Sequence, residues 1–206
     1  LLDAISDLKE IDIDQFKAEN NLNQKEIIAL LPGSREQEVT KMLELMLSVR
    51  PNFQEYQFVI AGAPSLPKEF YQKFVDENVH FVSNKTYDLL RCSKAALVTS
   101  GTATLETALL NIPEVVCYRS SRISYEIGKR VVKNIKYISL VNLIMDQEIV
   151  TELIQSDLNT KNLVKELELI LEGNSREKML HNLELLREKL GGKGASDLAA
   201  EIIING

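Results

Sequence analysis

Short runs of apolar residues alternate with longer amphipathic stretches from residue 25 onward. The runs are rich in β-branched and aromatic residues and end at Gly, Pro, Asn or Ser, which is typical of buried strands. We expect six strands, at residues 27–31, 58–61, 80–82, 95–99, 115–118 and 137–140. Helical spacing occupies residues 36–50, 67–78, 102–110 and 125–133. Buried strands joined by helices predict an α/β fold with a Rossmann-like, doubly wound parallel sheet in the order 3-2-1-4-5-6.

The two ends of the chain depart from this alternation. Residues 1–24 are polar, acidic and rich in Asn, so we interpret them as a linker or a loosely attached arm. From residue 147 the pattern predicts a helical tail, broken by glycines at 191–194. Its expected helices cover residues 147–155, 162–172, 175–190 and 195–204, and Asn159-Thr160 is a plausible cap for the second of these.

Composition excludes several classes of protein. The 206 residues are 45% hydrophobic and 26% charged, so the chain is expected to fold without a disulfide or metal. Its formal net charge of −6 argues against general nucleic-acid binding. Two histidines and two cysteines, Cys92 and Cys117, without CxxC spacing argue against a zinc site and favour reduced thiols in a reducing compartment. We find neither an apolar run long enough to span a membrane nor a signal peptide.

The first candidate binding segment follows the first expected strand. Ligands of open α/β sheets bind at the carboxyl ends of the strands. Gly33 permits a tight turn there, Ser34 can cap the next helix, and Arg35 adds a fixed positive charge. Together with the free N–H groups of a helix start, these residues suit a phosphate or a carboxylate. An ordinary strand-to-helix turn with a solvated arginine accounts for them about as well.

The second candidate segment, residues 99–106, follows the fourth expected strand and reads TSGTATLE. Its small residues allow close approach of a ligand, and Ser100, Gly101 and Thr102 with the helix start can hold a diphosphate. Glu106 lies one helical turn later and can accept hydrogen bonds from sugar hydroxyls. A capping box explains Thr102 and Glu106 alone, but not why the whole turn is small. Neither a Walker A loop nor GxGxxG is present, so we expect no dinucleotide cofactor.

Three further segments point less clearly to a binding site. Asn142 follows the last expected strand, where it could bond a ligand or simply form a turn. Residues 151–155 read as an ordinary amphipathic helix with Glu152 and Gln155 exposed. Residues 119–136 are strongly basic, which fits either an anionic lipid surface or a solvated helix face. Their cationic residues are Arg119, Arg122, Lys129, Arg130, Lys133 and Lys136, against the single acid Glu126. We see no Ser/His/Asp or Cys/His arrangement.

Taken together, these segments resemble lipid-A-disaccharide synthases. The resemblance rests on LPGSR (31–35), TSGTATLE (99–106), IPEVVCYRSSRISYEIGKRVVK (112–133), YISLVNLI (137–144) and TELIQ (151–155), in the family's order and spacing. LLDAI (1–5) resembles the family's segment between its two halves. Val141 and Thr151 stand where the family usually has proline.

The resemblance implies a GT-B glycosyltransferase of two Rossmann-like halves, of which this chain is the C-terminal, donor-binding half. We expect a linker at residues 1–24, a nucleotide-sugar-binding domain at 25–172, and C-terminal helices at 173–206 that pack on it or cross to the other half. The implied reaction transfers 2,3-diacylglucosamine from UDP-2,3-diacylglucosamine to lipid X with inversion, releases UDP, and uses no metal or other cofactor.

The resemblance also implies roles for individual residues. Gly33, Ser34, Arg35, Ser100, Gly101, Thr102 and Glu106 would bind the nucleotide diphosphate, and Thr104, Asn142, Glu152 and Gln155 would line the donor-sugar cleft. The catalytic base is expected in the other half, so this half alone should be inactive. Arg119, Arg122, Lys129, Arg130 and Lys133 would form a patch for acidic lipid, placing the enzyme in the cytoplasm on the inner membrane.

Two alternatives stay open. One is the donor half of another UDP-sugar GT-B enzyme or of a nonhydrolysing UDP-sugar epimerase. The other is a non-catalytic module that docks on a membrane or a partner protein, which UDP binding would distinguish. The oligomeric state is open as well, a homodimer included.

Overall fold

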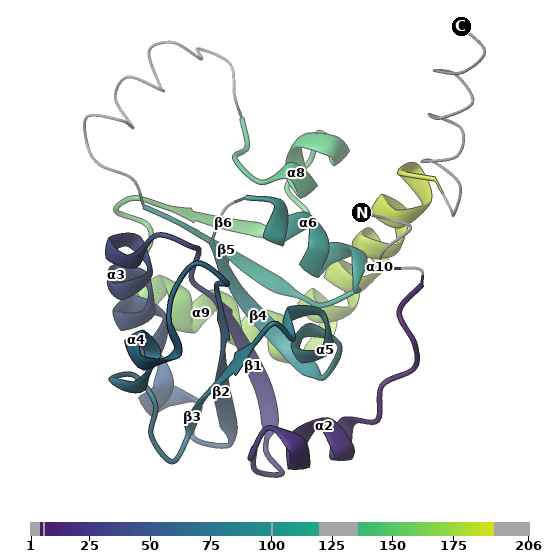
Figure 1. Cartoon of the computed structure of the whole chain (residues 1–206). Coiled ribbons are helices and arrows are strands. Elements are labelled where there is room, and N and C mark those ends of the chain that lie inside the picture. Colours follow the sequence, from purple (N-terminus) through teal and green to yellow (C-terminus); the bar gives the residue numbers. More distant parts are fainter. Residues whose placement is uncertain (1–4, 6, 100, 120–135, 192–206) are drawn as a thin grey trace, which may run out of the picture.

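A six-stranded sheet forms the centre of the computed structural model, which describes residues 5, 7–99, 101–119 and 136–191 (Figure 1). Its order is β3-β2-β1-β4-β5-β6, and every neighbouring pair is parallel. The strands are β1 (Glu26–Leu31), β2 (Tyr56–Gly62), β3 (Val79–Ser83), β4 (Ser93–Thr99), β5 (Glu114–Tyr118) and β6 (Thr151–Ile154). The expected Rossmann-like class and strand order are therefore confirmed.

Helices cover both faces of this sheet. Successive side chains of a strand point to opposite faces, and both faces carry buried apolar residues that the helices cover. In β1, Ile28 and Leu30 face the cluster that contains residues of α3, α9 and α10, whereas Ile27 and Ala29 face the cluster that contains α2 and α5. The helices are α2 (Ile13–Glu19), α3 (Glu36–Leu47), α4 (Lys68–Gln72), α5 (Thr86–Arg91), α6 (Thr102–Leu109), α8 (Leu140–Met145), α9 (Thr160–Leu171) and α10 (Gly173–Lys189), with a 3-10 turn at Arg50–Asn52.

The sixth strand lies elsewhere than predicted. Residues 137–140 are not a strand, because Ser139 caps α8 by accepting a hydrogen bond from the N–H of Asn142 at 3.3 Å. The expected helix at 147–155 is also wrong, since Thr151–Ile154 is β6 and pairs with β5. Periodicity cannot separate a strand from a helix over so few apolar residues, and the edge strand is only partly buried.

Other elements follow the expectations more closely. Asn159 caps α9 as predicted, since its side chain accepts from the N–H of Asn162 at 3.0 Å. The helix expected at 67–78 is reduced to α4, and α5 was not expected. Within residues 1–24, α2 buries Phe16 in the cluster beside β1. The helices expected at 125–133 and 195–204 lie outside the described residues. Across the described parts of the chain, no helix combines the length and apolarity needed to cross a membrane.

Candidate functional site

The two candidate binding segments meet at the carboxyl edge of the sheet, because β1 pairs with β4. Gly33 follows β1 with a φ of +99°, a conformation that favours glycine. A Cβ atom on Gly33 would lie 3.8 Å from Cγ2 of Thr99, the last residue of β4. The turn after β1 therefore lies beside the carboxyl end of β4, as expected for neighbouring strands of a parallel sheet.

The turn after β1 exposes its polar residues. Ser34 is not the cap of α3: Arg35 occupies the N-cap position without a side-chain cap, and the Ser34 carbonyl accepts from Ser65 Oγ at 2.9 Å. The Arg35 side chain is 82% exposed and contacts Glu38 Oε1 at 3.4 Å. Because an exposed pair of this kind is worth little, the guanidinium is free to turn towards an anion.

The turn after β4 is built on glycine. Gly101 has a φ of +146° and occupies the N-cap position of α6, with no side-chain cap. The capping-box explanation of Thr102 and Glu106 therefore does not hold, since the cap residue is a glycine and has no side chain that could accept from the first N–H groups of α6. Thr104 is buried and donates to the Gly101 carbonyl at 2.9 Å, so it braces the turn from inside. Ser100 lies outside the described residues.

Glu106 borders a cavity of about 510 Å³ at the same edge. The Tyr87 phenol donates a hydrogen bond to Glu106; burial, and secondarily this carboxylate, raises the pKa of Tyr87. The cavity is lined by Leu8, Asn84, Lys85, Thr86, Tyr87, Asp88 and Glu106. The sequence analysis missed residues 84–87, although they follow β3 as the other two segments follow β1 and β4. The rule that points to the carboxyl ends of strands could have found them.

Asn142 and Glu152 join parts of the fold to one another. The Asn142 side chain is fully buried. Its amide nitrogen donates to the Val150 carbonyl at 2.8 Å and to Glu152 Oε1 at 2.9 Å. Its amide oxygen accepts from the N–H groups of Ile149 and Val150 at 2.8 and 3.1 Å. Glu152 also accepts from the backbone N–H groups of 138 and 139 and from the Ser139 hydroxyl, at 2.7 to 2.9 Å. With its amide saturated inside the protein, Asn142 has a structural role in joining α8 to β6.

Gln155 and Arg119 lie at the ends of the neighbouring strands β6 and β5. The Gln155 N–H donates to the Tyr118 carbonyl at 2.9 Å, and Arg119 donates to the Leu158 carbonyl at 2.6 Å. Arg122, Lys129, Arg130 and Lys133, the other members of the expected lipid patch, lie outside the described residues. Among the described residues, no group of three His, Cys, Asp or Glu side chains is arranged to hold a metal ion.

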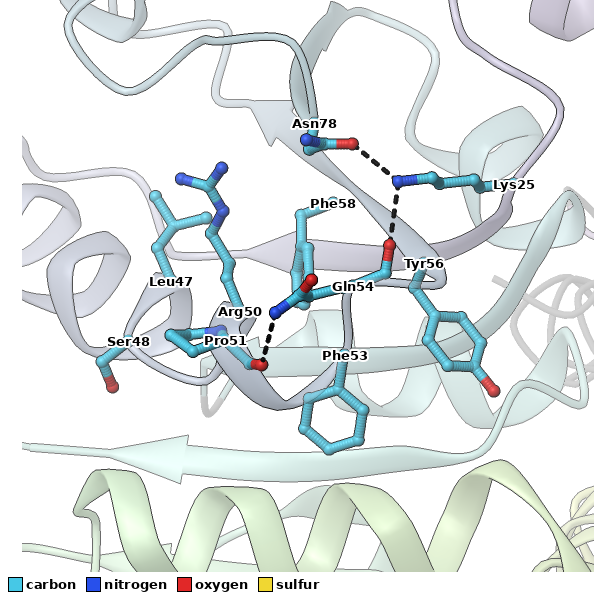
Figure 2. Close-up of a pocket in the computed structure, with 10 residues that line it drawn as sticks. All are labelled: Lys25, Leu47, Ser48, Arg50, Pro51, Phe53, Gln54, Tyr56, Phe58 and Asn78. Carbon is cyan, nitrogen blue, oxygen red and sulfur yellow. Dashed lines mark hydrogen bonds between the residues drawn. The ribbon is translucent and has the colours of Figure 1, made fainter.

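A second cavity, of about 530 Å³, lies at the opposite edge of the sheet (Figure 2). Its lining includes Lys25 and Asn78, which precede β1 and β3, and Arg50 from the 3-10 turn. Lys25 Nζ donates to the carbonyl of Gln54 and to Asn78 Oδ1, both at 2.8 Å, as Figure 2 shows. Ligands of open α/β sheets bind at the carboxyl edge, so we do not assign the donor site here.

Comparisons with known proteins identify the family. A family model described as lipid-A-disaccharide synthetase matches residues 1–204. The chain belongs to this family. It is 34% identical over 209 residues to the lipid-A-disaccharide synthase of Sulfurihydrogenibium sp. (strain YO3AOP1), covering 92% of this chain and 54% of that protein. Identity to the synthase of Syntrophus aciditrophicus (strain SB) is 38% over 182 residues, covering 84% and 47%. The chain thus spans about half the length of these relatives.

Solved structures support the same fold at lower identity. An S. aureus MnaA–UDP co-structure matches with a TM-score of 0.62 and 16% identity, covering 98% of this chain and 51% of that chain. The spinosyn rhamnosyltransferase SpnG matches with a TM-score of 0.57 and 11% identity, covering 82% and 42%. This member of the lipid-A-disaccharide synthetase family therefore shares its Rossmann-like fold with these solved structures.

Proposed function

We propose that this chain is the donor-binding part of a lipid A disaccharide synthase. The whole enzyme would transfer 2,3-diacylglucosamine from UDP-2,3-diacylglucosamine to lipid X and release UDP. Residues 25–172 would bind the donor, residues 1–24 would connect to the other half, and the helices from 173 would pack on the donor domain or cross over. The other half would carry the acceptor site and the catalytic base, so the chain alone would bind UDP without transferring sugar.

One observation carries this proposal: the exposed turn at Gly33–Arg35 lies beside Thr99, the end of the strand that leads into the glycine turn at the start of α6. Both turns are of the kind that holds phosphate, and they meet at the edge where this class of fold binds ligands. The nearby cavity next to Glu106 has the volume of a small-molecule site. We place the diphosphate between the two turns, the ribose at Glu106, and the base in the cavity beside Tyr87. The UDP named for the S. aureus structure agrees with this choice of nucleotide.

Arg35 and the α6 N-terminus would then stabilise the leaving group. As the acceptor hydroxyl attacks the anomeric carbon, the bond to UDP breaks and negative charge grows on the diphosphate. A guanidinium and free N–H groups are donors that strengthen as this charge develops. In the implied mechanism, which uses no metal, these protein groups carry the stabilisation themselves.

The test is calorimetric titration of the chain with UDP and with uridine. Arg35→Ala should weaken UDP binding about 10- to 150-fold, the loss of about 1.5–3 kcal/mol expected for a charged hydrogen bond. Uridine binding should not change, because uridine lacks the diphosphate. Arg187→Ala, on the exposed side of α10, is the matched control. Absence of UDP binding would favour a docking module, and equal losses for both ligands would assign Arg35 to folding.

A further inference from the structure

Gln155 has an unusual backbone conformation for its residue type. Its φ is +52°, in the left-handed region, directly after β6. The other described non-glycine residues with positive φ are Asn or Asp, whose short side chains tolerate this region. Gln lacks that adaptation, so its surroundings must hold it there. Backbone strain of this kind concentrates at functional sites.

The loop after β6 is held by side chains at every position. The carbonyl oxygens of residues 155–158 all accept hydrogen bonds from side-chain donors. Asn159 and Asn162, from the start of α9, supply the donors for residues 156 and 157 at 2.9 to 3.3 Å. Arg119 supplies the donors for the two ends of the loop, at 2.6 Å to the Leu158 carbonyl and 3.4 Å to that of Gln155.

Arg119 differs from the two asparagines in its position in the sequence, because it comes from a distant part of the chain. Asn159 and Asn162 are next to the loop in sequence and would move with it, whereas Arg119 follows β5, the strand that pairs with β6. Its guanidinium therefore fixes the loop relative to the sheet. Both hydrogen bonds come from Nη2, whose two N–H groups lie in the plane of the guanidinium and can serve one carbonyl each.

We propose that Arg119 is a positioning residue for the donor sugar, acting through Gln155. It holds the 155–158 loop so that Gln155 keeps its left-handed conformation at the carboxyl edge, where the Gln155 amide binds the sugar of the nucleotide-sugar. This inference rests on the proposed function, which places a UDP-sugar at that edge. It gives Arg119 a role distinct from contact with lipid.

The experiment compares the affinities of the chain for UDP and for UDP-N-acetylglucosamine, used as the sugar-bearing probe. Gln155→Ala and Arg119→Gln should each lower the affinity for the sugar-bearing probe relative to UDP by about three- to tenfold, the range of one hydrogen bond. The double variant should lose no more than either single variant, because both act through one contact. Arg119→Lys should recover part of the loss, and Arg187→Gln is the control.

A spectroscopic readout separates positioning from general stability. The side-chain amide signal of Gln155, assigned by its loss in Gln155→Ala, should shift in NMR spectra with UDP-N-acetylglucosamine and not with UDP. Arg119→Gln should abolish this shift while UDP affinity stays within twofold of the unmodified chain. Arg119→Met is the second variant if Arg119→Gln does not fold.

The outcomes distinguish the two proposals. Absence of UDP binding by the unmodified chain overturns the proposed function. Retained UDP binding with an unchanged relative affinity in Arg119→Gln overturns the positioning role alone. An equal loss for both ligands, or failure of both Arg119 variants to fold, also overturns it, because Arg119 would then serve the diphosphate or the fold.

Discussion

Glu114 is a fully buried carboxyl group whose two oxygens have no hydrogen-bond partner in the structure of the described chain. Burial raises its pKa well above the ordinary value. The Cys117 thiol is coupled to it electrostatically; burial first, and Glu114 second, raises the pKa of that thiol, so it stays neutral at physiological pH. Glu114 therefore remains protonated in the folded chain and ionises readily only when the chain unfolds.

The sign and size of the effect follow from this difference. Below about pH 4.3 the carboxyl group is protonated in both states and has no pH-dependent effect. Above that, the unfolded chain loses the proton and the folded chain keeps it, so the free energy of unfolding falls by about 1.4 kcal/mol per pH unit until the folded pKa is reached. Each pH unit in this window therefore removes a sizeable share of a typical domain's stability.

The assay is urea unfolding at several pH values, followed by far-UV circular dichroism because the chain has no Trp. Glu114→Gln keeps the shape and cannot ionise. Its free energy of unfolding should exceed that of the unmodified chain by an amount that grows between pH 5 and pH 7. Glu168→Gln, which changes an exposed carboxylate on α9, controls for the loss of charge. Parallel stability curves for Glu114→Gln and the unmodified chain would refute the argument.

Three further predictions concern the donor site, the fold and the membrane. Glu106→Gln should lower the affinities for UDP and for uridine by the same factor of about five, since both ligands carry the ribose. A titration in which only the affinity for UDP falls would contradict this. Asn142→Ala should lower the free energy of unfolding by about 3 kcal/mol or more, because several buried groups would lose their hydrogen-bond partner. A urea midpoint near that of the unmodified chain would disprove this. Changing Arg122, Lys129 and Lys133 together to Glu should abolish co-sedimentation with anionic liposomes at low salt and spare UDP affinity; equal sedimentation would show that the segment is only solvated.

The core of the fold could be predicted from the sequence because buried parallel strands leave a strong pattern. Residues 27–30 and 95–98 are apolar at every position, and both runs lie in central strands. The pattern fails at the edge of the sheet. β6 is four residues long and half exposed, and its sequence fits a helix turn as well as a strand. Only pairing with β5 decides its conformation, and that contact is not local in sequence.

The same reasoning explains why some site residues could be placed from the sequence and others could not. Gly33 and Gly101 sit in turns whose backbone angles favour glycine, so their neighbourhood was visible from residue type and strand order. The structural contacts of Asn142 could not be predicted, because an Asn at a strand's end and an Asn that joins α8 to the residues before β6 look alike in sequence. What separates them is whether the amide is already saturated by the protein. A buried amide with every hydrogen bond made inside the fold has no donor or acceptor left for a sugar, whereas the exposed Arg35 has. Ligand chemistry at this edge is therefore expected from the groups that the fold leaves available.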